Sequence, residues 1–159
     1  MADLSPIPVE QLPLGRILGI DYGEKRFGLA VSDPMQTIAF PLITLFRKGQ
    51  GFPVEQIISS VQEQAAVALV VSLPLHMNGS LGDKAEAAQA FAALLAEAAA
   101  IPVFTQDERW TTASAHKSLH ERGQQPSRQR DKIDQIAAAF MLQAFLDRIQ
   151  FRRRHPSGS

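Results

Sequence analysis

Short apolar runs and longer segments with helical spacing alternate along this chain, and their order predicts its secondary structure. The apolar runs have the length of strands, whereas residues such as Val54, Ile57 and Val61 recur at the spacing of an amphipathic helix. The segment 83–100 is rich in alanine, leucine and glutamate, which favour helices. The pattern predicts strands over 16–22, 26–32, 37–48, 68–75 and 101–108, and helices over 52–66, 83–100, 111–123 and 131–149.

The order of these elements predicts an α/β fold with a mixed sheet. Three strands come before the first helix, and the later strands alternate with helices. The sequence Gly-Glu-Lys at 23–25 has the length and glycine content of a hairpin connection between the first two strands. Pro41 lies within the third predicted strand, which places that strand at an edge of the sheet or at a bulge.

Length and composition are those of one ordinary globular domain. The chain has 159 residues, enough for a substantial core, and no cysteine, which excludes disulfides and thiolate metal sites. We expect a flexible lead at 1–15, a single domain at 16–150 and a basic, disordered tail at 151–159. A signal-peptide pattern and an apolar run of membrane-spanning length are both missing, so the sequence predicts a cytoplasmic protein.

A formal net charge of zero conceals a strong asymmetry between the two parts of the chain. Residues 1–108 hold 6 Lys and Arg against 12 Asp and Glu, whereas residues 109–159 hold 10 against 4. A basic segment of this kind favours an anionic partner, although a solvated basic surface explains the charge equally well.

Three acidic positions stand out because of where the predicted elements place them. Asp21 ends the first strand and Asp107-Glu108 ends the last one, so parallel strands would bring these acids to the same end of the sheet. Asp134 falls between Met141 and Phe145 on the apolar stripe of the final helix. Converging carboxylates repel one another unless a cation such as Mg²⁺ or Mn²⁺ lies between them.

Each acid also has an ordinary structural interpretation. Asp21 could begin the turn that follows the strand, where aspartate is common. Glu108 could form a surface ion pair with Arg109. If Asp131 caps the final helix, Asp134 is the acid favoured in its first turn by the helix dipole. The three positions taken together favour a site more strongly than any one of them does alone.

Four segments of the chain resemble the YqgF/RuvX family in order and spacing: GIDYGEKRFGLAVSD, VVSLPLHMNGSLGDKAEAAQAFAALL, DERWTTASA and KIDQIAAAFMLQAFLD. They cover most of residues 17–147. The resemblance implies a ribonuclease-H-like mixed sheet with helices on both faces, whose first three strands form an antiparallel meander. Two positions depart from the family pattern, Ser72 where glycine is usual and Trp110 where leucine is usual, and neither removes an acid.

The resemblance also implies a catalytic metal site. Asp21, Glu108 and Asp134 are the positions that match the family's acidic residues, and they would hold two Mg²⁺ or Mn²⁺ ions for phosphodiester hydrolysis. The expected products carry a 5′-phosphate and a 3′-hydroxyl. Because adjacent residues on a strand face opposite sides, only one of Asp107 and Glu108 can face the metals, and we choose Glu108.

A second set of residues is predicted to contact the substrate, and it consists of Lys25, Arg26, Arg109, Thr111, Thr112 and Lys132. Lys25 and Arg26 are equally well explained as solvated hairpin charges, and the two threonines as a helix cap. The basic segments 122–132 and 152–154 would add salt-sensitive attraction to phosphates.

These features together predict a metal-dependent endonuclease that acts on structured nucleic acid. The preferred substrate is the 5′ end of pre-16S rRNA during ribosome maturation, with ribosomal precursor particles as partners and no membrane. The alternatives are a Holliday junction resolvase acting on branched DNA, an actin-like ATPase, and a non-catalytic binding or assembly factor. Cleavage that depends on Asp21 separates the nucleases from the binding factor, and ATP turnover identifies the ATPase. The sequence leaves the oligomeric state open.

Overall fold

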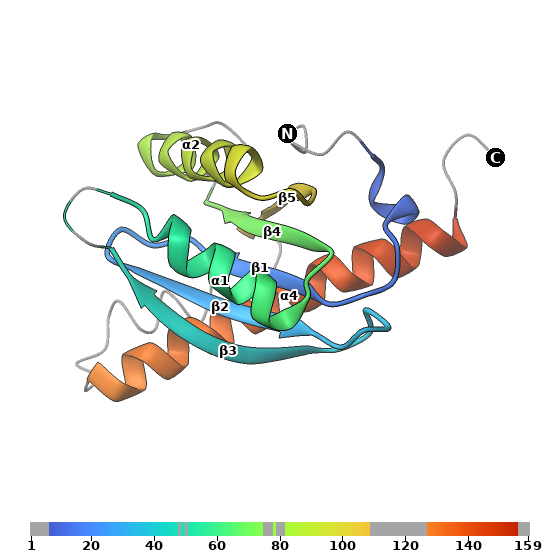
Figure 1. Cartoon of the computed structure of the whole chain (residues 1–159), viewed down its shortest axis with the longest axis horizontal. Coiled ribbons are helices and arrows are strands. Elements are labelled where there is room, and N and C mark those ends of the chain that lie inside the picture. The colour runs from blue at the N-terminus through green and yellow to red at the C-terminus, as the bar shows by residue number, and fades with distance from the viewer. Residues whose placement is uncertain are drawn as a thin grey trace.

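The computed structural model describes residues 7–47, 49, 51–74, 78, 82–108 and 127–155. Five strands and three α-helices, preceded by the short 3₁₀ helix η1 (Val9–Gln11), make up this part of the chain (Figure 1). The strands are β1 (Ile17–Asp21), β2 (Arg26–Ser32), β3 (Ala39–Phe46), β4 (Ala68–Leu73) and β5 (Val103–Asp107). The α-helices are α1 (Val54–Gln64), α2 (Asp83–Ala98) and α4 (Ser127–Arg154).

The strands form one mixed sheet in the order β3-β2-β1-β4-β5. β1, β2 and β3 pair antiparallel as a meander, whereas β4 pairs parallel with both β1 and β5. This topology confirms the predicted mixed sheet and its opening meander. The register between β2 and β3 shifts next to Leu29 and Ala30, opposite Pro41, and β3 is an edge strand, as the proline predicted.

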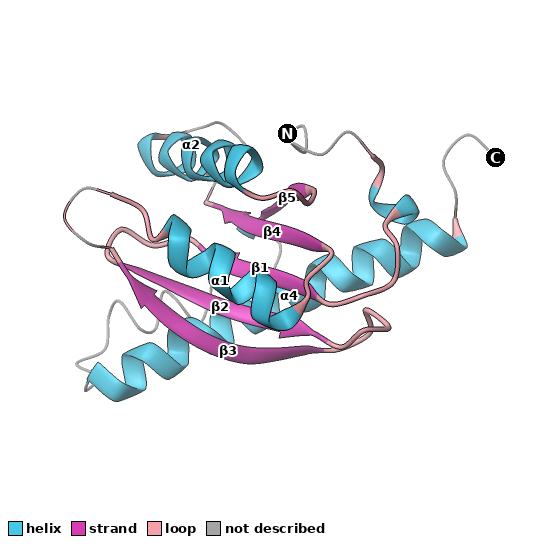
Figure 2. Ribbon diagram, in the orientation of Figure 1, coloured by secondary structure: helices cyan, strands magenta, loops and turns pink. Residues whose placement is uncertain are grey.

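Helices cover both faces of the sheet, as predicted (Figure 2). Helices α1 and α2 lie on one face, where residues such as Phe91 and Ile57 pack against Leu18 and Ile20 of β1. The long helix α4 crosses the other face and forms a second core, in which Phe145 packs against Phe104 of β5. Strands β1 and β4 are buried along their whole length because both of their faces are covered.

Three predicted boundaries need correction. Helix α4 begins at Ser127, before the predicted start at 131, so Asp134 lies beyond the first turn and its interpretation as a first-turn acid is wrong. The same helix continues to Arg154, so the first residues of the predicted tail at 151–159 are helical. Within the predicted flexible lead, Val9 and Leu12 are buried in the core beside α4. The predicted helix at 111–123 lies outside the described residues.

None of the helices in the described ranges is long and apolar enough to cross a membrane.

The turn between β2 and β3 is fixed by two polar side chains. The Asp33 carboxylate accepts hydrogen bonds from the Thr37 and Ile38 amides. Burial alone would raise the pKa of the Asp33 carboxyl, but the hydrogen bonds from Ile38 and from the hydroxyl and amide of Thr37 hold that pKa below its usual range. The turn therefore keeps its charged cap at neutral pH.

Gln36 in this turn connects the N-terminal segment to the far end of α4. Its side chain is completely buried, and its amide group donates to the carbonyls of Pro13 and Gly15 at 2.9 and 3.0 Å. Arg153 donates to its amide oxygen at 2.9 Å, and Gln150 donates to its backbone carbonyl at 3.1 Å. Gln36 holds these contacts with a φ of 61°, a backbone conformation that glycine adopts more easily.

We expect Gln36→Ala to lower the free energy of unfolding by about 2 kcal/mol, because it removes a completely buried side chain that bonds to Pro13, Gly15 and Arg153. Gln36→Gly should recover about 1 kcal/mol of this loss, since glycine tolerates the positive φ. Urea unfolding followed by circular dichroism measures both. Gln143→Ala is the matched control, because Gln143 also joins this turn to α4 but is only half-buried. A loss no larger for Gln36→Ala than for Gln143→Ala would contradict the expectation.

Candidate active site

The carboxyl ends of the three parallel strands β1, β4 and β5 meet at one end of the sheet. Asp21 is the last residue of β1 and lies one position beyond the paired residues Ile20 and Val71. Leu73 of β4 pairs with Asp107 of β5, and Glu108 follows directly. We call this the acidic end of the sheet. Ligand and catalytic sites of open α/β sheets form at such ends.

Asp21 faces helix α4 from within the protein. Along β1, Ile17 belongs to the core beside α4, and a side chain at Gly19 would meet Leu142 of α4, so alternation places Asp21 on the same face. The residue is only 3% exposed. A buried carboxylate is costly unless polar groups or cations compensate it, so the interpretation of Asp21 as a simple surface turn residue does not hold.

Ser72 on the neighbouring strand β4 holds the Asp21 carboxylate in place. Its hydroxyl donates to Oδ1 of Asp21 at 3.3 Å and accepts a hydrogen bond from the Tyr22 amide at 2.8 Å. One buried hydroxyl therefore orients both the acid and the backbone that follows it. In the sequence, Ser72 was noted only as a departure from a family pattern. No neighbouring residue in the sequence predicts that Ser72 lies beside β1 or that it bonds to Asp21.

Tyr22 anchors the end of β1 on the opposite face of the sheet. Its ring packs against Phe27 and Phe91 with centroids 5.4 and 5.6 Å apart, and Phe52 completes the cluster. Arg47 donates to the Tyr22 hydroxyl at 3.0 Å and lies over the Phe52 ring at 4.6 Å. Such aromatic and cation–π contacts make this strand end a rigid support for the preceding acid.

Asp134 reaches the acidic end because β2 presents a glycine to helix α4. Gly28 pairs directly with Asp21, and a side chain at Gly28 would collide with the backbone carbonyl of Asp134. Asp21 and Asp134 are thus both neighbours of one residue, although they are far apart in the sequence. Asp134 is 7% exposed and lies on the buried stripe of α4, as its spacing predicted.

The Asp134 carboxylate forms an ion pair with Arg26 at the start of β2. The Nε atom of Arg26 lies 2.8 Å from Oδ2 of Asp134, and the two side chains are 26% and 10% exposed. Arg26 is also predicted to contact substrate phosphates beside Asp21. In the fold its guanidinium pairs with one of the three acids.

Glu108 follows β5 directly and lies outside the strand, which ends at Asp107. Phe104 packs against Phe145, and the Gln106 side chain accepts a hydrogen bond from Arg148 of α4 at 3.2 Å. Gln106 is therefore on the α4-facing side of β5, and alternation turns Asp107 to the other side. Glu108 is 6% exposed, whereas Asp107 is half-buried.

These acids fit a divalent metal in the chemistry of their side chains. Carboxylate oxygens are the ligands that Mg²⁺ and Mn²⁺ prefer, and Asp21, Glu108 and Asp134 are all buried near one end of the sheet. Across the ranges that the structure describes, no three histidine, aspartate or glutamate side chains are close enough to hold one metal ion. The side chains as they stand are instead organised by the Arg26 ion pair and the Ser72 hydrogen bond.

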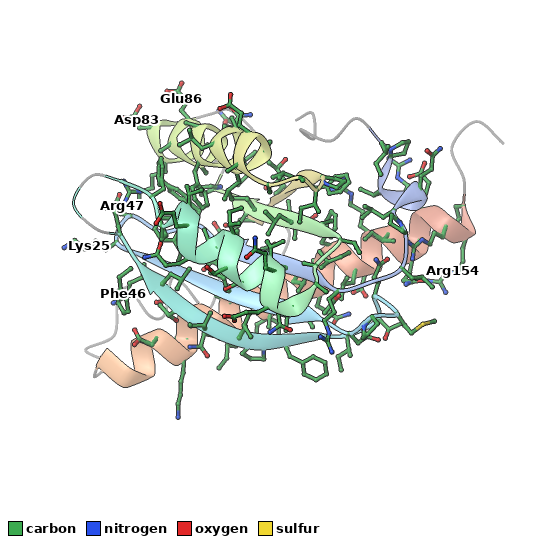
Figure 3. All side chains as sticks on the ribbon, in the orientation of Figure 1. Lys25, Phe46, Arg47, Asp83, Glu86 and Arg154 are labelled. Atoms are coloured by element: carbon green, nitrogen blue, oxygen red, sulfur yellow. The ribbon has the colours of Figure 1, made fainter. Side chains whose placement is uncertain are left out.

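The remaining predicted site residues fall into two groups. Lys25 and Lys132 are exposed next to the acidic end, Lys25 in the turn before β2 and Lys132 two residues before Asp134. Figure 3 shows Lys25, Phe46 and Arg47 at this end and Arg154 at the opposite one. The predicted contribution of residues 152–154 to phosphate binding is therefore distant from the acids, and Arg153 is engaged with Leu12 and Gln36. Arg109, Thr111 and Thr112 lie outside the described residues.

The mixed five-stranded sheet opens with an antiparallel meander, is covered on both faces and carries buried acids at the ends of β1 and β5. This combination defines the class of ribonuclease-H-like proteins. Comparison with known families identifies the member. Residues 15–148 match the family model described as RuvX, Holliday junction resolvase, and the chain belongs to this family.

Curated relatives cover nearly the whole chain. A protein of Pelotomaculum thermopropionicum is 44% identical over 144 residues, which are 90% of this chain and 94% of that protein. A protein of Roseiflexus is 38% identical over 133 residues, 84% of this chain and 94% of that protein. Both are named "Putative pre-16S rRNA nuclease".

Solved structures with a similar chain path are more distant in sequence. Thermus thermophilus RuvC in complex with a Holliday junction substrate has a TM-score of 0.49 and 19% identity, over 85% of this chain and 96% of that chain. The yeast mitochondrial Holliday junction resolvase has a TM-score of 0.49 and 10% identity, over 92% of this chain and 85% of that chain.

We expect Gly28→Ala to displace α4 at Asp134 and to lower the free energy of unfolding by roughly 1–3 kcal/mol, because the added methyl group meets backbone rather than a movable side chain. Urea unfolding measures the stability, and the NMR shifts of Asp134 report the displacement. Gly19→Ala is the control, since it meets the Leu142 side chain at 2.9 Å in the middle of the same helix. Equal perturbation of Asp134 by both variants would refute a specific role for Gly28.

We expect Ser72→Ala to speed hydrogen exchange of the Tyr22 amide by roughly fivefold, because that amide loses its buried acceptor. Ser32→Ala is the reciprocal control: the Ser32 hydroxyl accepts a hydrogen bond from the Ile17 amide at the other end of β1. Ser32→Ala should affect Ile17 and leave Tyr22 unchanged. Native-state exchange followed by NMR gives both rates, and unchanged Tyr22 protection in Ser72→Ala would show that the hydroxyl does not hold this strand end.

Proposed function

We propose that this protein is a divalent-metal-dependent endonuclease that hydrolyses phosphodiester bonds in structured nucleic acid, and that it processes the 5′ end of pre-16S rRNA. The observation that carries the proposal is the placement of Asp21 and Asp134 beside Gly28, with the buried Glu108 directly after β5 at the same end of the sheet. Three buried acids from three elements at one end of a sheet are expensive to maintain for stability alone. Membership of a resolvase family and the names of the relatives support the same chemistry.

In this proposal Asp21, Glu108 and Asp134 hold the metal ions. When bound, such ions supply an activated water nucleophile and neutralise the charge that grows on the leaving oxygen. The chain itself supplies rigidity: Ser72 fixes the direction of the Asp21 carboxylate, and the aromatic cluster around Tyr22 fixes the strand behind it. Pre-oriented ligands of this kind reduce the reorganisation required during the reaction.

The exposed cations next to the acidic end position the substrate in our proposal. Lys25 and Lys132 flank the acids from the β1–β2 turn and from α4, so phosphates on both sides of the scissile bond would meet a positive charge. Contacts of this type recognise the backbone rather than the bases. We therefore expect selection by the shape of the nucleic acid and binding that weakens as salt increases.

We rank pre-16S rRNA above a four-way DNA junction as the substrate. The relatives at 44% and 38% identity bear the rRNA name, whereas the family description names the junction. Symmetric cleavage of a junction requires two sites related by a two-fold axis, and one chain offers a single set of acids.

We expect the purified protein to cleave a labelled pre-16S rRNA 5′ fragment in the presence of Mg²⁺ or Mn²⁺, leaving a 5′-phosphate. Asp21→Asn, Glu108→Gln and Asp134→Asn should each reduce the single-turnover rate more than about a hundredfold, beyond the effect typical of groups that only support a metal ligand. A four-way DNA junction assayed in parallel tests the second substrate.

Two further variants sharpen this experiment. Asp147→Asn changes an exposed acid on the same helix and should leave the rate unchanged. Asp107→Asn tests the neighbour of Glu108 and should reduce the rate far less than Glu108→Gln. Cleavage that survives in Asp21→Asn would assign the activity to another site or a contaminant, and binding of RNA without cleavage would identify a non-catalytic assembly factor.

A further inference from the structure

Arg26 brings a positive charge to the acidic end of the sheet. Its guanidinium Nε is 2.8 Å from Oδ2 of Asp134, and the Asp134 side chain is only 10% exposed. Arg26 comes from the first position of β2, two residues before Gly28, so it shares the α4-facing side of that strand. An arginine here supplies the positive charge that the clustered acids require.

The same oxygen atom has two potential cationic partners if the acids bind metal as we propose. A guanidinium and a divalent cation both favour a carboxylate oxygen, but they cannot occupy the same position around Oδ2 of Asp134. Even at a different oxygen of the same carboxylate, a fixed positive charge repels an incoming cation. The ion pair therefore opposes metal binding at Asp134.

We propose that Arg26 is a built-in competitor of the divalent metal: it holds Asp134 in position until a cation displaces it, and so sets the metal concentration at which the site fills. This inference rests on the proposed function, because it concerns the same acids. It differs from the role first expected for Arg26, which was direct contact with substrate phosphates. It also differs from a clamp that orients Asp134 for the metal, because a clamp and a competitor change metal affinity in opposite directions when removed.

The test is the affinity of the protein for Mn²⁺ alone, measured by isothermal titration calorimetry without any nucleic acid. While Arg26 occupies Asp134, only a fraction of the molecules is competent to bind the metal. Removing Arg26 raises the apparent affinity by the reciprocal of that fraction. For an ion pair of this partial exposure we expect Arg26→Gln to bind Mn²⁺ roughly five- to tenfold more tightly than the wild type. Arg26→Lys, which keeps the charge, should stay close to the wild-type value.

Lys25→Gln is the matched control for charge, because it removes one positive charge from the neighbouring residue, which is exposed in the turn. We expect its Mn²⁺ affinity to remain within about twofold of the wild type, since an exposed charge is largely screened. An equal gain in Lys25→Gln and Arg26→Gln would overturn the proposal, because general charge would then explain the result.

Thermal unfolding separates competition from a loss of structure. Arg26→Gln should lower the melting temperature without metal, because Asp134 loses its partner, and should enlarge the upward shift that Mn²⁺ produces. If the role of Arg26 were purely structural, Arg26→Gln would lower the metal-free melting temperature without enlarging the shift that Mn²⁺ produces. Weaker or unchanged Mn²⁺ binding by Arg26→Gln would also overturn the competition.

Asp134→Asn makes failure of this inference distinguishable from failure of the proposed function. If wild-type Mn²⁺ binding depends on Asp134 but is not strengthened in Arg26→Gln, the competition is wrong and the metal-dependent nuclease stands. If neither the wild type nor Arg26→Gln shows binding that Asp134→Asn abolishes, the metal dependence itself is wrong.

Discussion

The close approach of helix α4 to the sheet is the contact on which the rest of the molecule depends. It is possible because β1 and β2 present Gly19 and Gly28 to the helix, where any side chain would meet Leu142 or the backbone at Asp134. This packing buries the second hydrophobic core and brings Asp134 beside Asp21. The dimensions of the candidate site are therefore set by two residues that have no side chain and no part in its chemistry.

Charge is the second constraint on this end of the sheet. Asp21, Glu108 and Asp134 are all nearly inaccessible to water, where ionised carboxylates need compensation. Ser72 provides one hydrogen bond to Asp21, and Arg26 provides a full positive charge to Asp134. The ion pair between Arg26 and Asp134 must be rearranged when a stronger cation binds this carboxylate.

Regular periodicity explains why much of this arrangement could be predicted from the sequence. Helical spacing placed Asp134 on the buried stripe of α4, because this property repeats within a single element. Strand alternation predicted only that Asp107 and Glu108 do not both face the metals, and the choice of Glu108 came from the family resemblance. Whether these acids are metal ligands stays a prediction. The Arg26–Asp134 pair and the Ser72 hydrogen bond could not be predicted, since they join elements that only the folded sheet brings together. The start of α4 at Ser127 was missed because its first turns are polar and carry no apolar stripe.

The order in which the acids occur along the chain has a consequence for biosynthesis. Asp21 is made early and Asp134 late, on a helix that follows all five strands and that covers one entire face of the sheet. Until α4 has left the ribosome, the sheet has an uncovered apolar face and Asp21 has no counterpart on that helix. A nascent chain is thus without a complete site throughout most of its translation.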